Sequence, residues 1–410
     1  MDTYRIADLF AGVGGVRLGF DRAFGKAAKT VFVSDIDHFA AQVYTDNFGH
    51  DPEVSGDITE IDVKDIPDFD ICLAGFPCQA FSNMGLKQGF KDPRGQLFQE
   101  VVRICKAKQP KVIFCENVKA LVNYNKGEAF NVIKTAFEKI GYKVYHQVLN
   151  SADFNVPQNR ERVYIVCFRK DIAPDGYTVC DAGKVRSGGI EKILLPDSEV
   201  AKHVLSDKYV AFLERRKEKS KASGNGFSYR VKEPGDIAGT LTCSPTSLDG
   251  NLVRYKDRLR KLAPRECARL QGFPDTFKLN VSDTQVYRLM GNSVTVPVIE
   301  TLARKICVAL GEKAAPFVSQ PKTPQIPRET VILPPVSNAG SEYRLEVDPA
   351  VKTTRIEDIP AEVKASSESV RRSNIRRRKK LCHCPVCQCG VLPLECRACL
   401  ARQKRRMGIR

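Results

Sequence analysis

The segment of this chain with the clearest capacity for chemistry runs from Gly75 to Ser82 and reads GFPCQAFS. Its cysteine, Cys78, comes directly after a short apolar run, Asp70–Ala74, which is typical of a buried parallel strand. Ligand crevices of open α/β sheets form at the carboxyl ends of such strands, so a thiol there is a candidate nucleophile. The usual role of a cysteine is that of a small buried hydrophobe, which we assign to Cys72, Cys105, Cys115, Cys167 and Cys307.

A glycine-rich turn, Phe10–Gly15 (FAGVGG), directly follows the first apolar run of the chain. Glycines there let the backbone approach a nucleotide-like ligand closely, although a tight structural turn has the same signature. Asp35 ends the next apolar run, where a carboxylate can accept hydrogen bonds from both ribose hydroxyls. Asp57, followed by Ile58, comes after a further run and could contact an adenine amine. Taken singly, either acid would more often be a solvated loop residue.

Two more motifs would share the rim of the same crevice. Glu116 follows the apolar run Lys111–Cys115, and a carboxylic acid in a partly desolvated pocket has a raised pKa and can remain a proton donor. A carboxylate that caps a helix is the alternative. The motif Gln158–Arg162 (QNRER) puts Arg160 and Arg162 on one face of a strand, where they could hold phosphate or a developing anion. Paired surface arginines without a function are the alternative here.

These residues need a sheet whose strand ends meet at one edge. Residues 4–170 alternate short apolar runs with helical patterns, which predicts an α/β fold with a doubly wound, mostly parallel sheet. The expected strands are Tyr4–Phe10, Thr30–Ser34, Asp70–Ala74, Lys111–Cys115, Tyr142–Leu149 and Arg162–Phe168. The expected helices are Gln96–Ala107, Glu128–Ile140, Pro264–Leu270 and Pro297–Leu310.

Changes in composition predict the domain boundaries. We expect residues 1–180 to form the first part of a catalytic domain and residues 261–312 to form its returning part. Between them, residues 181–260 are richer in Gly, Pro and Ser and predict a smaller, irregular domain. Residues 313–370, rich in Pro, Ser and charge, are predicted to be a linker. Residues 371–410 are a basic, cysteine-rich tail.

The net charge of +17 is concentrated in this tail, which holds 13 Lys and Arg residues and one acid. A compact basic segment suggests a polyanionic partner, most simply nucleic acid, whereas a solvated disordered arm is the alternative.

Six of the 15 cysteines also lie in the tail. Two Cys-x-x-Cys pairs, Cys384 with Cys387 and Cys396 with Cys399, have a spacing like that of zinc ribbons. Further potential ligands are Cys382 and Cys389. The sequence therefore predicts a structural zinc site, with a reduced disordered tail as the alternative.

Together the motifs resemble those of the DNA cytosine-5 methyltransferases, in particular the bacterial modification enzymes. The resemblance covers about residues 4–310 and includes, in family order, Arg265–Pro274 (RECARLQGFP) and Gly291–Val294 (GNSV). It implies transfer of a methyl group from S-adenosylmethionine (SAM) to C5 of a cytosine flipped out of double-stranded DNA. In this mechanism Cys78 forms a transient covalent bond to C6 of the base. The enzyme would serve a restriction-modification system or another form of DNA modification.

The resemblance also implies roles for single residues. Glu116 would bind N3 and the exocyclic amine of the base, and Arg162, supported by Arg160, would stabilise charge at O2. Gln79 and Ser82 would begin a loop that closes over the flipped base. The residues expected to line the SAM pocket are Phe10, Gly12, Gly14, Asp35, Asp57, Ile58, Leu97, Asn292 and Ser293. In the target-recognition domain, 181–260, phosphate contacts are expected from Arg254, Lys256, Arg258 and Arg260, and from Lys261 just after it.

Two other functions use the same fold. One is an RNA cytosine methyltransferase, although the Cys-Phe-Thr signature of that branch is absent. The other is a catalytically silent DNA-binding protein, against which the intact Cys78, Glu116 and Arg162 argue. No apolar run reaches the roughly 20 residues of a membrane helix, and the chain does not begin like a signal peptide. We therefore expect a monomer in the bacterial cytoplasm or nucleoid, with no membrane and no obligate protein partner.

Overall fold

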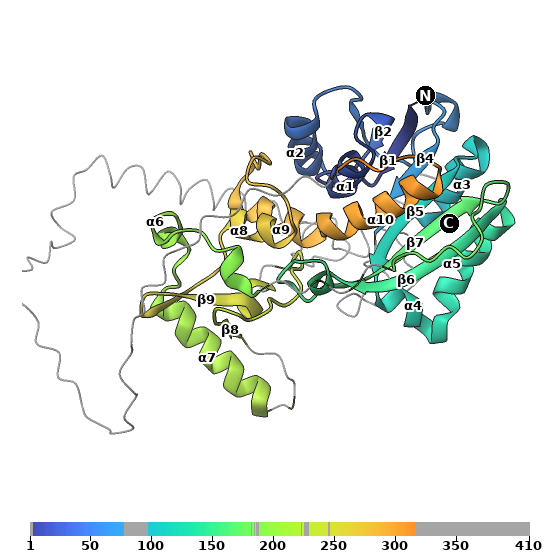
Figure 1. Cartoon of the computed structure of the whole chain (residues 1–410). Coiled ribbons are helices and arrows are strands. Elements are labelled where there is room, and N and C mark those ends of the chain that lie inside the picture. Colours follow the sequence, from blue (N-terminus) through green and yellow to red (C-terminus); the bar gives the residue numbers. More distant parts are fainter. Residues whose placement is uncertain are drawn as a thin grey trace, which may run out of the picture. The chain divides into compact units, whose positions relative to one another are not determined.

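The computed structural model describes residues 3–77, 97–181, 183, 185, 188–222, 224, 229–244 and 247–316. All of them lie in the first of two units of the chain, Met1–Glu329. The centre of this unit is a seven-stranded sheet with the strand order β3-β2-β1-β4-β5-β7-β6 (Figure 1). The strands are β1 (Tyr4–Leu9), β2 (Ala28–Ser34), β3 (Val54–Ser55), β4 (Ile71–Ala74), β5 (Val112–Val118), β6 (Tyr142–Asn150) and β7 (Glu161–Arg169).

The first five strands are parallel, and β7 runs antiparallel to both β5 and β6. The predicted doubly wound, mostly parallel sheet is therefore confirmed. The strand order reverses between β1 and β4, and ligand crevices of open α/β sheets lie at such a reversal, outside the carboxyl ends of the strands. The residues that follow β1, β2 and β4 therefore converge on one edge.

Both faces of the sheet are covered by helices, and this explains why the strands read as continuous apolar runs. On one face, alternate strand residues pack against α3 (Phe98–Lys108) and α5 (Glu128–Lys139). On the other face, the intervening strand residues pack against α1 (Gly15–Phe24) and α10 (Val296–Ala309). All four helices predicted from the sequence are present to within two residues at either end.

Helix α10 brings the end of the described fold back to its beginning, because α10 packs along α1 in the core of the second face (Figure 1). The approach is close, since a Cβ atom at Gly19 would lie 2.5 Å from Cγ2 of Ile299. At the C-terminal end of α10 the Tyr4 hydroxyl donates a hydrogen bond to the Leu310 carbonyl at 3.3 Å. The first strand and the last helix therefore stabilise each other.

The strand β5 is longer than predicted, because it continues from the apolar run through Glu116 to Val118. The extension pairs with β7, and Val118 lies opposite Arg162. Glu116 is thus held inside a paired strand rather than in the loop after it.

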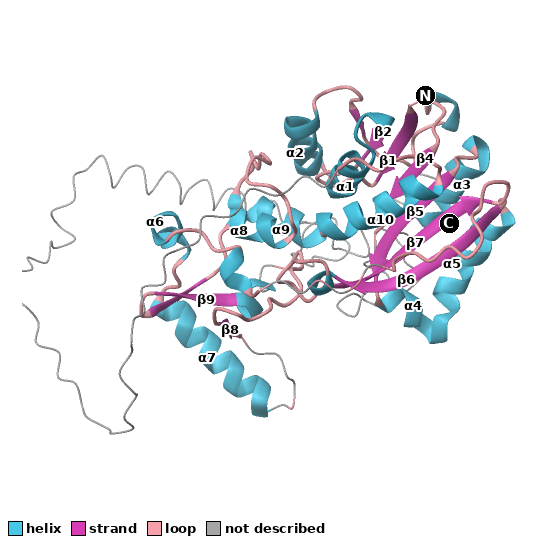
Figure 2. Cartoon of the chain, in the orientation of Figure 1, coloured by secondary structure: helices cyan, strands magenta, loops and turns pink. Residues whose placement is uncertain are grey.

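The segment 181–260, predicted to be a smaller irregular domain, has more regular structure than its composition predicts (Figure 2). A second sheet has the order β10-β9-β8, and its strands are β8 (Val231–Lys232), β9 (Leu252–Tyr255) and β10 (Arg258–Arg260). Beside it lies α7 (Asp207–Ala222), a helix of 16 residues. The sequence did not reveal this helix because Leu213 is its only buried residue among those described. The other α-helices are α2 (His38–Phe48), α4 (Ala120–Asn123), α6 (Asp197–Val200), α8 (Pro264–Leu270) and α9 (Asp283–Asn292).

The prediction that Arg260 contacts DNA phosphates is wrong. Its guanidinium forms two hydrogen bonds with the carboxylate of Glu266, at 2.7 and 2.9 Å, and both side chains are buried. The same carboxylate accepts hydrogen bonds from the backbone amides of Leu195 and Ala263. A buried charge must be paired and hydrogen-bonded, so Arg260 joins β10 to α8 and does not face solvent.

Within the parts of the chain described by the structure, no helix combines the length and the apolar character needed to cross a membrane.

Candidate functional site

The glycine-rich turn after β1 is built on left-handed backbone conformations. Phe10, Gly12 and Gly14 have φ angles of 56°, 56° and 85°. A Cβ atom at Gly14 would lie 2.3 Å from Cε2 of Phe48, whereas nothing lies within 4 Å of one at Gly12. Gly14 is therefore required for packing, while the backbone at Gly12 is open to a ligand. The helix α1 starts at Gly15, so its free amides and positive dipole end lie beside the turn.

Asp35 follows β2 directly and holds the turn from the side. Its carboxylate accepts a hydrogen bond from the Gly12 amide at 2.7 Å and one from the Asp37 amide at 2.8 Å. Burial raises the pKa of Asp35, and the two amide hydrogen bonds partly oppose this increase. The next residue, Ile36, has a side chain that is 76% exposed. Sequence reasoning did not single it out, although an exposed apolar residue next to the acid is the kind of surface that an aromatic ring covers.

Asp37 connects this region to a distant helix. Its side chain caps α2 by accepting hydrogen bonds from the Phe39 and Ala40 amides. It also forms a two-point ion pair with Arg288 of α9, in which Nη2 of Arg288 lies 3.0 Å from Oδ1 and Nη1 contacts Oδ2. This ion pair lowers the pKa of Asp37. Sequence analysis missed Arg288, because no local spacing shows that it faces a residue 251 positions away.

A buried polar group lies beneath the glycine-rich turn. The Tyr44 hydroxyl donates to the carboxylate of Asp8 in β1 at 3.3 Å, and Nη1 of Arg17 donates to Tyr44 at 3.1 Å. Burial raises the pKa of Asp8 to about 7, while Arg17 and the Tyr44 hydrogen bond lower it. The network fixes β1 relative to α1 and α2 just below the turn.

The other predicted cofactor residues lie around the same edge. Asp57 accepts hydrogen bonds from the amide and hydroxyl of Thr59, at 2.9 and 2.8 Å, and Ile58 is buried in the core. Leu97 directly precedes α3 and is half-buried. These contacts show that the local fold holds Asp57 in one orientation, with part of its carboxylate already occupied.

Asn292 and Ser293 reach the turn from the returning part of the chain, at the end of α9. Asn292 is exposed, and Ser293 is buried. The Ser293 hydroxyl makes no hydrogen bond with any residue that the structure describes, although it is close to the turn, 3.0 Å from the position of a Cβ atom at Gly15. A buried hydroxyl without a partner points to a polar ligand at this position.

Glu116 lies at the same edge, inside β5. Nε of Arg162 lies 3.1 Å from Oε1 of Glu116, and both side chains are largely buried. Burial raises the pKa of Glu116, whereas Arg162 and then Arg160 lower it. The neighbouring Asn117 donates through Nδ2 to the Phe76 carbonyl at 3.1 Å. This hydrogen bond ties β5 to the start of the segment that contains Cys78.

Gln158 and Arg160 connect three segments behind Glu116. The Gln158 side chain accepts from the Leu241 amide at 3.0 Å and donates to the Leu270 carbonyl at 2.8 Å. Arg160 is buried and donates to the carbonyls of Leu241 (2.8 Å), Gly291 (3.3 Å) and Ser293. These three contacts are to backbone carbonyls, so Arg160 fixes the backbone at Leu241 and the 291–293 segment relative to β7.

Several predicted residues lie outside the described residues: Cys78, Gln79 and Ser82, and the tail cysteines Cys382, Cys384, Cys387, Cys389, Cys396 and Cys399. The cysteines predicted to be structural, Cys72, Cys105, Cys115, Cys167 and Cys307, are all buried. In the described ranges, no group of three or more His, Cys, Asp or Glu side chains is arranged to hold a metal ion.

Comparisons with known proteins give a consistent result. The family model of the C-5 cytosine-specific DNA methylases matches residues 4–307. The chain is 45% identical over 312 residues to the type II methyltransferase M.NlaX of Neisseria lactamica, covering 75% of this chain and 97% of the relative. It is 38% identical over 319 residues to the type II methyltransferase M.HhaI of Haemophilus parahaemolyticus, covering 75% of this chain and 96% of the relative.

A solved structure with a similar fold is the Dnmt2 methyltransferase of S. pombe. The TM-score is 0.62 at 22% identity, and the match covers 75% of this chain and 99% of the other. At this identity the comparison supports the fold alone.

Proposed function

We propose that the carboxyl edge of the sheet is the active site of this chain, because the chain belongs to the C-5 cytosine-specific DNA methylase family. The chain is a DNA cytosine-5 methyltransferase, and SAM is the methyl donor of this family. The cofactor would lie over the glycine-rich turn between β1 and α1, beside the end of β2. The base would enter beside β4 and β5, where Cys78 would lie close to Glu116. The reversal of strand order between β1 and β4 supports this arrangement.

The described residues fit SAM. The open backbone at Gly12 and the amides at the start of α1 can receive its carboxylate, and Asp35 can bind the ribose hydroxyls with its remaining lone pairs. Ile36 offers an apolar surface to the adenine. The unpartnered hydroxyl of Ser293 can bind a polar group at the methionine end. Further contacts would come from Phe10, Gly14, Asp57, Ile58, Leu97 and Asn292.

The chemistry requires help because C5 of cytosine is a weak nucleophile. We assign the activating step to Cys78, whose thiolate adds its electron pair to C6 of the flipped base and gives C5 enamine character. SAM, when bound, supplies the methyl group that C5 accepts, and the broken S–CH3 bond leaves S-adenosylhomocysteine as the second product. A base then removes the C5 proton, the C5–C6 double bond re-forms, and the Cys78 thiolate leaves with the electrons of the S–C6 bond.

Glu116 and Arg162 would control charge on the ring during these steps. A carboxylic acid whose pKa is raised by burial can hold a proton at N3 while electrons move into the ring. Arg162, 3.1 Å from Glu116, partly offsets the increase in the pKa of Glu116 that burial causes, and its guanidinium can also donate to O2. Arg160 would be a positioning residue, because its contacts are to backbone carbonyls. Gln79 and Ser82 would begin the closing loop.

The observation that best supports the assignment is the buried Glu116–Arg162 pair, one residue from the Asn117 hydrogen bond to Phe76. It is tested by incubating the enzyme with labelled SAM and duplex DNA, RNA or tRNA. We expect label in duplex DNA only, and bisulfite sequencing should place it at C5 of cytosines within one recurrent sequence. Labelling of RNA alone would contradict the assignment, as would the absence of transfer to any of the three.

The ion pair between Arg288 and Asp37 should support cofactor binding. Arg288→Gln removes the ion-pair partner of Asp37, whose backbone amide donates a hydrogen bond to Asp35. Asp35 should then be held less firmly, so the KM for SAM should rise about 10-fold while kcat changes little. Arg288→Lys should restore part of this loss. Steady-state kinetics at saturating DNA measures both effects.

The matched control for this prediction is Lys202→Gln, which removes a 3.1 Å ion pair with Asp283, the first residue of the same helix. Its KM for SAM should equal that of the wild type. Equal increases in both variants would show that α9 is merely destabilised.

We propose the predicted domain plan for the rest of the chain. Residues 1–180 and 261–312 form the catalytic domain, residues 181–260 read the DNA sequence, and residues 313–370 link them to the tail. The enzyme would act as a monomer on the DNA of the bacterial cytoplasm or nucleoid, within a restriction-modification system. Analytical ultracentrifugation should give the mass of one chain, and a dimer at micromolar concentration would contradict this part.

The zinc site of the tail is a separate proposal that rests on the spacing of Cys384, Cys387, Cys396 and Cys399, with Cys382 and Cys389 as further candidates. Elemental mass spectrometry of the full chain should find one zinc ion per molecule. The double variant Cys384→Ser/Cys387→Ser should lose it. Wild-type protein purified without zinc, and unable to take it up under reducing conditions, would refute the site.

A further inference from the structure

We propose that one exposed face of α7 holds the phosphate backbone of duplex DNA beside the recognised sequence, an inference that rests on the proposed function. The face consists of Lys208, Phe212, Arg215 and Lys219, which we call the α7 stripe. These residues are separated by four, three and four positions, so they lie on the same side of the helix. All four are exposed.

The other side of α7 is buried against the small sheet β10-β9-β8. Leu213 is buried against Leu205 and Leu252, and Tyr209 packs beside them. Arg216 belongs to this side, and its Nη1 lies 3.6 Å from the carboxylate of Asp249. The sheet of the smaller domain therefore fixes the direction in which the α7 stripe faces.

The positive charges of the α7 stripe are not paired with acidic side chains of the described residues. Among the residues that the structure describes, Lys208, Arg215 and Lys219 form no ion pair. Of the acids of the helix, Asp207 pairs with Arg258 at 3.2 Å and Glu214 accepts a hydrogen bond from Tyr229. The third, Glu218, is exposed at the border of the stripe, three residues from Arg215. A helix that keeps three cations on one exposed face and its paired acids elsewhere presents a positive surface.

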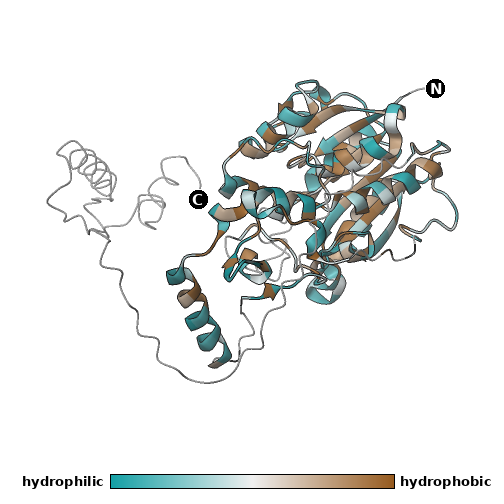
Figure 3. Ribbon diagram, turned by 60° about the vertical axis from the view of Figure 1, so that its left-hand side comes forward, coloured by the Kyte–Doolittle hydropathy of each residue, from teal (hydrophilic) through white to brown (hydrophobic). Residues whose placement is uncertain are grey.

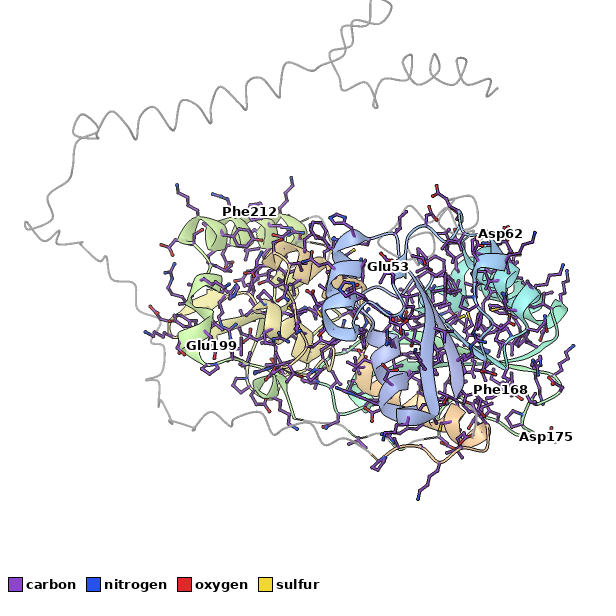
Figure 4. All side chains as sticks on the ribbon, turned by 90° about the horizontal axis from the view of Figure 1, so that it is seen from above. Glu53, Asp62, Phe168, Asp175, Glu199 and Phe212 are labelled. Atoms are coloured by element: carbon purple, nitrogen blue, oxygen red, sulfur yellow. The ribbon has the colours of Figure 1, made fainter. Side chains whose placement is uncertain are left out.

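The dimensions of the stripe match a DNA strand. A helix rises 1.5 Å per residue, so Lys208 and Lys219 lie about 16 Å apart along the axis. Along the duplex axis one strand presents a phosphate about every 3.4 Å. Because the strand winds around that axis, consecutive phosphates lie farther apart than this, and the three cations of the α7 stripe match a few of them. Phe212, 46% exposed and labelled on α7 in Figure 4, lies between the cations and can pack on deoxyribose. Figure 3 shows mostly hydrophilic colours over the second half of the helix.

The occupant we favour is DNA rather than an acidic protein, because the helix belongs to the same unit as the active-site edge and the substrate of that edge is a polyanion. Phosphate contacts carry no sequence information, so the α7 stripe would add affinity and hold the register of the duplex without choosing the bases.

The experiment compares two double variants of the full chain on the same helix. Lys208→Gln/Lys219→Gln removes two charges from the α7 stripe, whereas Lys217→Gln/Lys221→Gln removes two charges from the other side. Both change the same residue types by the same charge, and thermal unfolding checks that both fold. Fluorescence anisotropy measures the Kd for a duplex of about 40 base pairs, and for one trimmed close to the methylated sequence, across a salt series.

We expect the stripe variant to raise the Kd for the long duplex about 10-fold at 0.15 M salt. The slope of log Kd against log salt should fall by about 0.9 for each phosphate that the variant no longer neutralises. Binding of the trimmed duplex should not change, and the control variant should behave as the wild type. Equal effects of both variants, or none, would overturn the proposal, as would an effect that is independent of duplex length. Binding is measured without methyl transfer, so failure of the proposed chemistry would appear separately in the labelled-SAM assay.

Discussion

Replacing Cys78 by alanine should reduce methyl transfer to duplex DNA by about 10⁴-fold or more, because no other group in the proposed mechanism can add to C6 of cytosine. Binding of SAM and of the duplex should persist, since the thiol acts only on the flipped base. Transfer of label from SAM under single-turnover conditions measures the loss. In the wild type, DNA that carries 5-fluorocytosine should trap the adduct as a complex that survives denaturation.

The control is Cys180→Ala, which removes a partly buried thiol far along the chain and should leave the rate unchanged. The trapped complex should form with the control and fail to form with Cys78→Ala. A Cys78→Ala enzyme that retains more than a few per cent of the wild-type rate, or a covalent complex through another residue, would contradict the assigned nucleophile.

Glu116→Gln should lower kcat by about 10²–10³-fold with little change in the KM for DNA, because the amide fills the same space but cannot deliver a proton to N3. The adjacent acid provides the control. Glu161 lies on the exposed side of the same region, where its carboxylate pairs with Lys119 at 2.9 Å. Glu161→Gln should therefore keep nearly the full rate. Similar losses in the two variants would place the effect in the fold of β5 and β7 instead of in the proton at N3.

The same glutamate should determine one limb of the pH profile. Burial raises the pKa of Glu116, and the protonated form is the active one in the proposed mechanism, so kcat should fall as the pH rises through that raised pKa. Arg162 lowers the pKa, so Arg162→Gln should move this limb to higher pH while also reducing the rate. Glu116→Gln should lack the limb altogether. A limb that persists in the glutamine variant belongs to another group.

The sheet could be predicted because its central strands, β1, β4, β5 and β7, are buried on both faces and therefore carry continuous apolar runs. The edge strand β3 has only two residues and leaves no such signal. The helix α7 escaped prediction for the opposite reason, since it buries a single residue and has almost no apolar periodicity. Arg260 was misassigned because its neighbours in the sequence are basic, whereas its partner, Glu266, lies six residues on in another element.

Some residues of the site could likewise be predicted from the sequence, and others could not. The turn at Phe10–Gly15, Asp35 and Glu116 could be located because each follows or ends an apolar run, and the topology then brings these runs to one edge. Arg288 and the placement of Ser293 depend on α9 returning to α2 and α1, a contact that no spacing in the sequence records. Cys78 and the tail cysteines lie outside the described residues, so their assignments stay predictions.

The packing of α10 on α1 sets an order of events during synthesis. While the ribosome is still adding the smaller domain, the apolar surface of α1 and the strands beneath it has no cover, because Val298, Ile299, Leu302 and Ile306 come at the end of the fold. At bacterial or eukaryotic elongation speeds this interval lasts on the order of tens of seconds. A nascent chain that stalls before residue 296 would thus expose this apolar surface to solvent. Chaperones that bind exposed apolar surface should engage the chain until the last helix emerges.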